Sequence, residues 1–92
     1  MKLIIAIVQN EISTKVVKSL MNKKHRTTKL SSTGGFLKSG NTTLLIGTED
    51  EKVDEVVKII EKECENIKNN KDEVTIGGAN IFILNMHDFK KI

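Results

Sequence analysis

The pattern of apolar and polar residues predicts a strand at each end of the chain and a helix after the first strand. Residues 3–8 are six consecutive apolar residues, which is typical of a strand buried on both faces. Residues 79–86 are again largely apolar and predict the last strand. Between Ser13, the expected N-cap, and Lys24, apolar residues recur at helical spacing and predict a helix. These apolar positions are Val16, Val17, Leu20 and Met21.

The middle of the chain predicts two strands and a second helix. Arg26 to Thr33 and Asn41 to Gly47 are rich in threonine and aliphatic residues, and β-branched side chains fit a pleated surface. Residues 48–51 form an expected capping box, in which the Thr48 side chain caps the start of the helix and the Glu51 side chain accepts a hydrogen bond from the backbone N–H of Thr48. The helix is expected to end near Ile67, with a polar connection over 66–72, an extended stretch over 73–76 and a bend at 77–78. Its apolar stripe is Val53, Val56, Val57, Ile60 and Cys64.

This order of elements predicts one domain, residues 1–92, of the α+β class. It is the ferredoxin-like βαββαβ arrangement, a four-stranded antiparallel sheet with two helices on one face. The first strand is apolar on both faces, and in the last strand Ile81 and Ile83 oppose Phe82 and Leu84. The helices can bury only one of these faces. We therefore expect the other face to be covered by further copies of the chain, in a closed homo-oligomer.

The connection between the two middle strands is expected to bind a ligand. It holds three of the six glycines of the chain, and glycine permits positive φ and close approach of the backbone to a ligand. It also carries Phe36 and Leu37, where solvent usually selects polar side chains. Loops held by a rigid sheet often carry binding residues.

The charge distribution indicates an anionic partner near this loop. The net charge is +3, but no acidic residue occurs between Ile12 and Thr48. That segment contains Lys15, Lys18, Lys23, Lys24, Arg26, Lys29 and Lys38. For Lys15, Lys18 and Lys23, solvation of a helix face is a sufficient explanation, whereas function and solvation are equally good explanations for Arg26, Lys29 and Lys38.

The sequence offers little support for catalysis, metal binding or a membrane location. Cys64 lies on an apolar stripe, and His25 and His87 have no Cys or His at ligand spacing. An RNA-binding module of this topology would need aromatic residues on its central strands, and only Phe82 lies clearly on a strand. A single cysteine fits a reducing compartment, and no apolar run approaches the roughly 20 residues of a membrane span. We expect a cytoplasmic protein that is not an enzyme and binds no nucleic-acid polymer.

A long motif resembles the PII-like cyclic-di-AMP receptors of Gram-positive bacteria. Its parts are Thr28-Lys29-Leu30, Thr33-Gly34-Gly35-Phe36-Leu37 and Gly40-Asn41-Thr42-Thr43, followed by Gly47. The beginning of the chain, residues 4–9, and the late segment Gly77-Gly78-Ala79 with Phe82 are also similar to that family. The resemblance covers essentially the whole chain.

The resemblance implies a homotrimer that assembles through its sheets and binds one cyclic-di-AMP in each cleft between subunits, without a cofactor or a metal. It also implies a signal receptor whose loop rearrangement is read by a downstream protein that the sequence does not identify. The residues expected to contact the ligand are Arg26, Thr28, Gly35, Phe36, Leu37, Asn41, Gly47 and Phe82. For Gly47 and Phe82, a purely structural role in strand exit or sheet packing is the alternative.

The chain departs from the family pattern in three places. Residues 66–72 stand where a long loop is usual, and Lys90 and Lys91 occupy a tail that often ends in glutamine. Lys24 and His25 replace a polar amide and an aromatic residue. The alternative function is therefore a PII-like regulatory trimer that binds ATP or no nucleotide and acts by protein contact.

Overall fold

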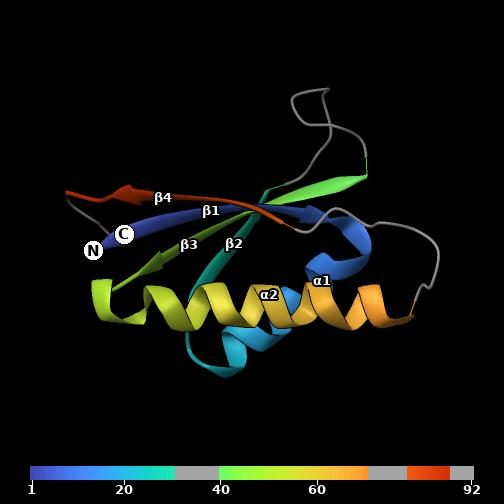
Figure 1. Ribbon diagram of the computed structural model, residues 1–92. Helices are drawn as coiled ribbons and strands as arrows, with labels where there is room; N and C mark the ends of the chain where they lie inside the picture. Colours follow the sequence, from blue (N-terminus) through green and yellow to red (C-terminus); the bar gives the residue numbers. More distant parts are fainter. Residues whose placement is uncertain (31–39, 71–78, 88–92) are drawn as a thin grey trace.

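The computed structural model describes residues 1–30, 40–70 and 79–87 and confirms the predicted α+β fold (Figure 1). Its strands are β1 (Lys2–Gln9), β2 (Arg26–Leu30), β3 (Asn41–Thr48) and β4 (Asn80–Asn85). Its helices are α1 (Asn10–Asn22) and α2 (Val53–Asn70), the latter preceded by a short 3-10 turn, η1 (Asp50–Lys52). The strands form one sheet in the order β2-β3-β1-β4, with every neighbouring pair antiparallel. Figure 1 shows both helices on the same side of this sheet.

The core lies between the sheet and the helices because β1 and β3 present alternate residues to that side. Ile4 pairs with Ile46 and Ala6 with Leu44, and all four are fully buried. The remaining buried apolar residues are Val8, Ile12, Val16, Leu20, Val56, Ile60 and Cys64. Cys64 therefore occupies the core position that the helical stripe predicted. Within the described residues, neither helix combines the length and the apolarity needed to cross a bilayer.

The opposite side of the sheet, which we call the open face, is also apolar. The register places Leu3 with Leu84 and Ile5 with Phe82 on this side. Leu84 is 48% exposed and Phe82 is 53% exposed. Apolar residues thus occupy both faces of the sheet, as the sequence predicted, and the helices cover only one of them. Assembly through the open face remains a prediction.

The predicted start of α1 was wrong. The helix begins at Asn10, directly after β1, with Gln9 in the N-cap position. Ser13 lies inside the first turn and is buried, and its hydroxyl donates a 2.8 Å hydrogen bond to the carbonyl oxygen of Asn10. The chain passes from strand to helix without a loop, so the predicted cap at Ser13 lies four residues after the observed N-cap, Gln9.

The predicted capping box before α2 was also wrong. Thr48 is the last residue of β3, where it pairs with Lys2 and is buried. Glu49 precedes the 3-10 turn η1, and no side chain caps that turn.

The second helix is longer than predicted. α2 continues to Asn70, so residues 66–70 are helical and not part of a polar connection. Predictions for the glycine-rich loop, for residues 71–78 and for the tail from Asp88 onward lie outside the described residues.

Candidate functional site

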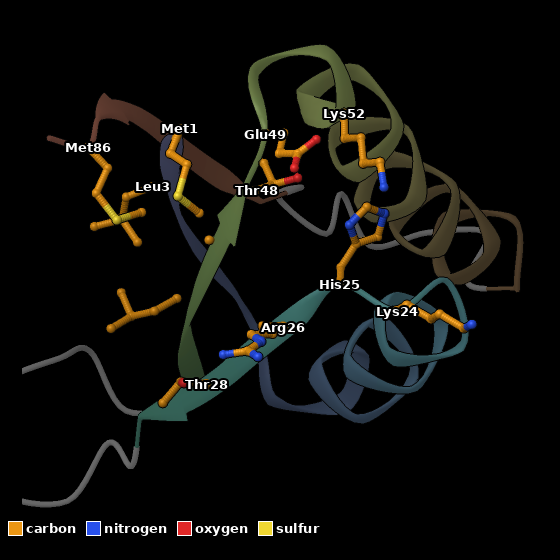
Figure 2. A pocket seen from close by; sticks show the side chains of 12 residues that line it. Met1, Leu3, Lys24, His25, Arg26, Thr28, Thr48, Glu49, Lys52 and Met86 are labelled. Atoms are coloured by element: carbon orange, nitrogen blue, oxygen red, sulfur yellow. The ribbon is translucent and has the colours of Figure 1, made fainter. Parts of the chain in front are cut away.

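A hollow of about 640 Å³ lies where β3 ends and β2 begins, beside the start of α2 (Figure 2). Its polar lining residues are Lys24, His25, Arg26, Thr28, Thr48, Glu49 and Lys52. Its apolar lining residues are Met1, Leu3, Leu45 and Met86, and Gly47 completes it. Three of the residues predicted to contact a ligand, Arg26, Thr28 and Gly47, therefore meet in one place.

The pairing of β2 with β3 explains why these three residues meet. Arg26 pairs with Gly47, and Thr28, two residues further along β2, pairs with Leu45. Residues two apart on a strand point to the same side of the sheet, so Arg26 and Thr28 share a face with Gly47. Because Gly47 has no side chain, the space beside Arg26 stays open.

The fold itself does not require glycine at position 47. The backbone there is not in the left-handed region, and an added Cβ would meet only the Met86 methyl carbon at 3.7 Å, an ordinary contact. The sequence left strand exit and sheet packing as alternatives for Gly47. Within the described residues of one copy, neither role requires glycine, and the ligand-binding role of Gly47 stays a prediction.

His25 connects the hollow to both helices. Its ring is 5% exposed, and Nε2 lies 2.7 Å from Oε2 of Glu55 on α2. Its backbone N–H donates a 2.9 Å hydrogen bond to the carbonyl oxygen of Leu20 near the end of α1. This residue fixes the first residues of β2 relative to the two helices. No local sequence pattern indicates this role, because Glu55 lies thirty residues further along the chain.

The charged residues in the lining of the hollow are mainly cationic. Lys24, Arg26 and Lys52 bring positive groups to it, and Glu49 is the single carboxylate among its lining residues. Lys24 has a left-handed backbone with φ +64°, which is uncommon outside glycine and asparagine. A site of this composition favours an anionic ligand.

Asn41, also predicted to contact the ligand, lies at the other end of β3. It pairs with Gln9 and lines a separate hollow of about 430 Å³ with Gln9, Asn10, Glu11 and Gly40. The rise of an antiparallel strand, about 3.4 Å per residue, places Asn41 about 20 Å from Gly47. Within one subunit, the structure does not bring Asn41 together with Arg26 and Thr28.

The other predicted contact residues lie elsewhere. Phe82 lies on the open face and is not among the residues that line the hollow. Gly35, Phe36 and Leu37 fall outside the described residues. In the described part of the chain, no three His, Cys, Asp or Glu side chains are grouped to hold a metal ion.

Comparisons with known proteins find a matching family model and similar solved structures. Residues 1–72 match the model of a protein family described as cyclic-di-AMP receptor. The fold is similar to the crystal structure of a functionally unknown protein from Pediococcus pentosaceus ATCC 25745, with a TM-score of 0.80 and 40% sequence identity. That match covers 99% of this chain and 96% of the other, so the two matched chains are nearly equal in length.

Proposed function

This chain belongs to the cyclic-di-AMP receptor family, and from that premise we propose that it binds cyclic-di-AMP at clefts between the subunits of a homotrimer. Binding rearranges the loop between β2 and β3, and a downstream protein reads this change. The protein acts as a receptor and performs no catalysis. The observation that carries the proposal is the convergence of Arg26, Thr28 and Gly47 on one cationic hollow.

The chemistry of these residues suits a cyclic dinucleotide. The guanidinium of Arg26 can form two parallel hydrogen bonds to a phosphate or stack on a base. The hydroxyl of Thr28 can donate to or accept from an adenine edge. The open space over Gly47 lets a flat base approach the strand backbone.

The separation of Asn41 from the hollow supports a site shared between subunits. A cyclic dinucleotide closes its two nucleotides into one compact ring, whereas about 20 Å of β3 separates Asn41 from Gly47. If Asn41 contacts the same ligand as Gly47, it comes from a neighbouring subunit. The apolar open face gives the neighbours a surface on which to associate, and Phe82 on that face could then reach the ligand bound by another copy.

The proposed rearrangement of the loop between β2 and β3 rests on the remaining predicted contact residues, which belong to this loop in the sequence. Gly35, Phe36 and Leu37 belong to the connection that begins after Leu30 and ends before Asn41. Ligand contacts made by Thr28 on β2 and by these residues would order the connection. Ordering the backbone of this connection costs about 1–2 kcal/mol per residue in conformational entropy. Part of the free energy of the ligand contacts therefore offsets this cost and does not appear as affinity.

ATP is the second candidate ligand. The observation in its favour is the excess of cationic residues in the lining, which includes Lys24, Arg26 and Lys52 but only one carboxylate, that of Glu49. A triphosphate carries more negative charge than the two phosphodiesters of a cyclic dinucleotide. A PII-like regulatory trimer that binds ATP would use the same hollow.

Calorimetric titration of the purified protein with cyclic-di-AMP, ATP and cyclic-di-GMP separates the two candidates. We expect selective binding of one cyclic-di-AMP per subunit, and a trimer mass in sedimentation equilibrium. Preferential binding of ATP would replace the first proposal with the second. A folded trimer that releases no heat with any of the three nucleotides would contradict both.

A further inference from the structure

We infer that Lys52, on the turn before α2, is an additional phosphate-binding residue of this site, and that the hydrogen bond between His25 and Glu55 positions it. The inference rests on the proposed function, since it names a further contact for the same ligand. Neither Lys52 nor Glu55 belongs to the motif that pointed to the site.

The number of phosphates in the proposed ligand favours a second cation near Arg26. Cyclic-di-AMP carries two phosphodiester groups, each with one negative charge, and Arg26 can pair closely with one of them. Lys24 and Lys52 are the other cationic residues that line the hollow. In Figure 2 the Lys24 amine is directed away from Arg26 and Thr28, whereas Lys52 extends from the start of α2 in the direction of His25.

Lys52 is well placed to reach a ligand over the hollow. It is the last residue of η1, and its backbone N–H closes that turn with a 2.9 Å hydrogen bond to the Glu49 carbonyl oxygen. Its side chain is exposed, so it is free of the desolvation cost of a buried ammonium. A lysine also carries a compact charge on a flexible four-carbon stem, which lets the amine follow a phosphate.

The hydrogen bond between His25 and Glu55 links the start of β2, which carries Arg26, to the start of α2, which directly follows Lys52. His25 directly precedes Arg26 on β2, and Glu55 follows Lys52 by three residues at the start of α2. Residues three apart on a helical segment lie on the same side. The 2.7 Å contact of the nearly buried His25 ring with Glu55 therefore sets the distance between the start of β2 and the start of α2.

The first test compares Lys52→Gln with Lys58→Gln by calorimetric titration with cyclic-di-AMP. Lys58 is exposed on α2, which follows η1, and does not line the hollow; each variant loses one positive charge. At low salt, Lys52→Gln should weaken binding about three- to tenfold, and the loss should shrink above about 0.5 M salt. Lys58→Gln should stay within twofold of the unmodified protein, and Lys52→Arg should retain most of the affinity.

The second test examines the positioning role through Glu55→Ala. Simple electrostatics predicts that removal of a carboxylate near an anion site raises the affinity, whereas loss of positioning lowers it. We expect a lower affinity for cyclic-di-AMP, with no further loss when Glu55→Ala is added to Lys52→Gln. Thermal unfolding of each variant without ligand shows whether the fold is retained. A raised or unchanged affinity, or fully additive losses, would overturn the positioning role.

The outcomes separate this inference from the proposed function. If the unmodified protein binds cyclic-di-AMP and Lys52→Gln behaves like Lys58→Gln, the role of Lys52 is refuted and the proposed function stands. If the unmodified protein does not bind cyclic-di-AMP, the proposed function and the inference fail together.

Discussion

At the scale of single residues, the φ angle shows which positions require glycine for the fold and which do not. Lys24 has φ +64° just after α1, where glycine or asparagine is usual. Gly40 has φ +93°, and Gly47 has no such conformation. The backbone of Lys24 is therefore strained. The backbone conformation at position 40 requires glycine, whereas at position 47 neither the backbone conformation nor the packing of the described residues does.

Lys24→Gly should stabilise the protein. Glycine adopts the left-handed region without the steric cost that lysine pays, so we expect a gain of about 1 kcal/mol in the free energy of unfolding. For a domain of this size, the midpoint of thermal unfolding should rise by about 4–8 °C. Lys23→Gly is the matched control, because Lys23 has φ −94° and should gain nothing from glycine.

Gly47→Ala should separate ligand binding from stability. The added methyl group makes one ordinary contact, so unfolding by urea should be almost unchanged. It also fills part of the hollow, so calorimetry should show cyclic-di-AMP binding that is at least about tenfold weaker, a loss of 1.4 kcal/mol or more. Gly40→Ala should behave in the opposite way in the unfolding experiment, with a loss of about 1 kcal/mol from φ +93° alone. Unchanged affinity in Gly47→Ala would return Gly47 to a structural role.

At the scale of the elements, both helices are held by side chains that fit between them and the sheet. Leu20 near the end of α1 is fully buried, while its neighbour Met21 is 61% exposed. The carbonyl oxygen of Leu20 also accepts hydrogen bonds from the backbone N–H groups of Lys23 and His25. The position of Leu20 therefore affects both the core and the approach to β2.

Leu20→Ala should destabilise the protein strongly, and Met21→Ala should not. Removal of a fully buried leucine side chain costs about 2–5 kcal/mol, which is a large part of the stability of a small domain. Met21→Ala removes mainly exposed surface, so a change below about 0.5 kcal/mol is expected. Urea unfolding of the two variants at equal protein concentration measures the difference, and similar losses would contradict this description of the core.

The sequence predicted the order of the elements correctly because that order depends on hydrophobic periodicity. It placed the start of α1, and the start and the end of α2, wrongly because these boundaries depend on local geometry. Ser13 carries a good cap residue type, but β1 runs straight into α1. The polar run that predicted a connection at 66–70 contains no proline or glycine that would end a helix.

Only the residues of the candidate site that lie in or next to the sequence motif could be predicted. Arg26, Thr28 and Gly47 lie on two strands that pair with each other; the motif contains Thr28 and Gly47, and Arg26 lies two residues before it begins. Lys52 and the bond between His25 and Glu55 depend on how α2 packs against the start of β2, and no local pattern encodes that contact.

At the scale of the whole molecule, the open face is the main feature that a single copy leaves unexplained. Leu3, Ile5, Phe82 and Leu84 lie together on it, and an exposed apolar surface of this kind marks an interface in soluble proteins. Adjacent residues on β4 point to opposite sides, and Ile83 pairs with Ile4 on the side of the helices.

Leu84→Glu should prevent formation of the proposed trimer, whereas Ile83→Glu should leave it intact. The two residues are neighbours on β4 and almost equally exposed, 48% and 47%, but only Leu84 lies on the open face. A charge buried between subunits costs several kcal/mol, which is enough to prevent association. Sedimentation equilibrium gives the mass of each variant. A trimer in Leu84→Glu, or equal dissociation in both variants, would exclude assembly through this face.

The length of β3 has a consequence for how the protein would respond in a cell. A ligand that needs Gly47 from one copy and Asn41 from another binds only where copies meet, so ligand binding and assembly are linked by mass action. In dilute protein, part of the binding energy is used to bring copies together, and more ligand is required for half-saturation. The number of protein copies that the cell synthesises would then set the nucleotide concentration at which the signal is switched on.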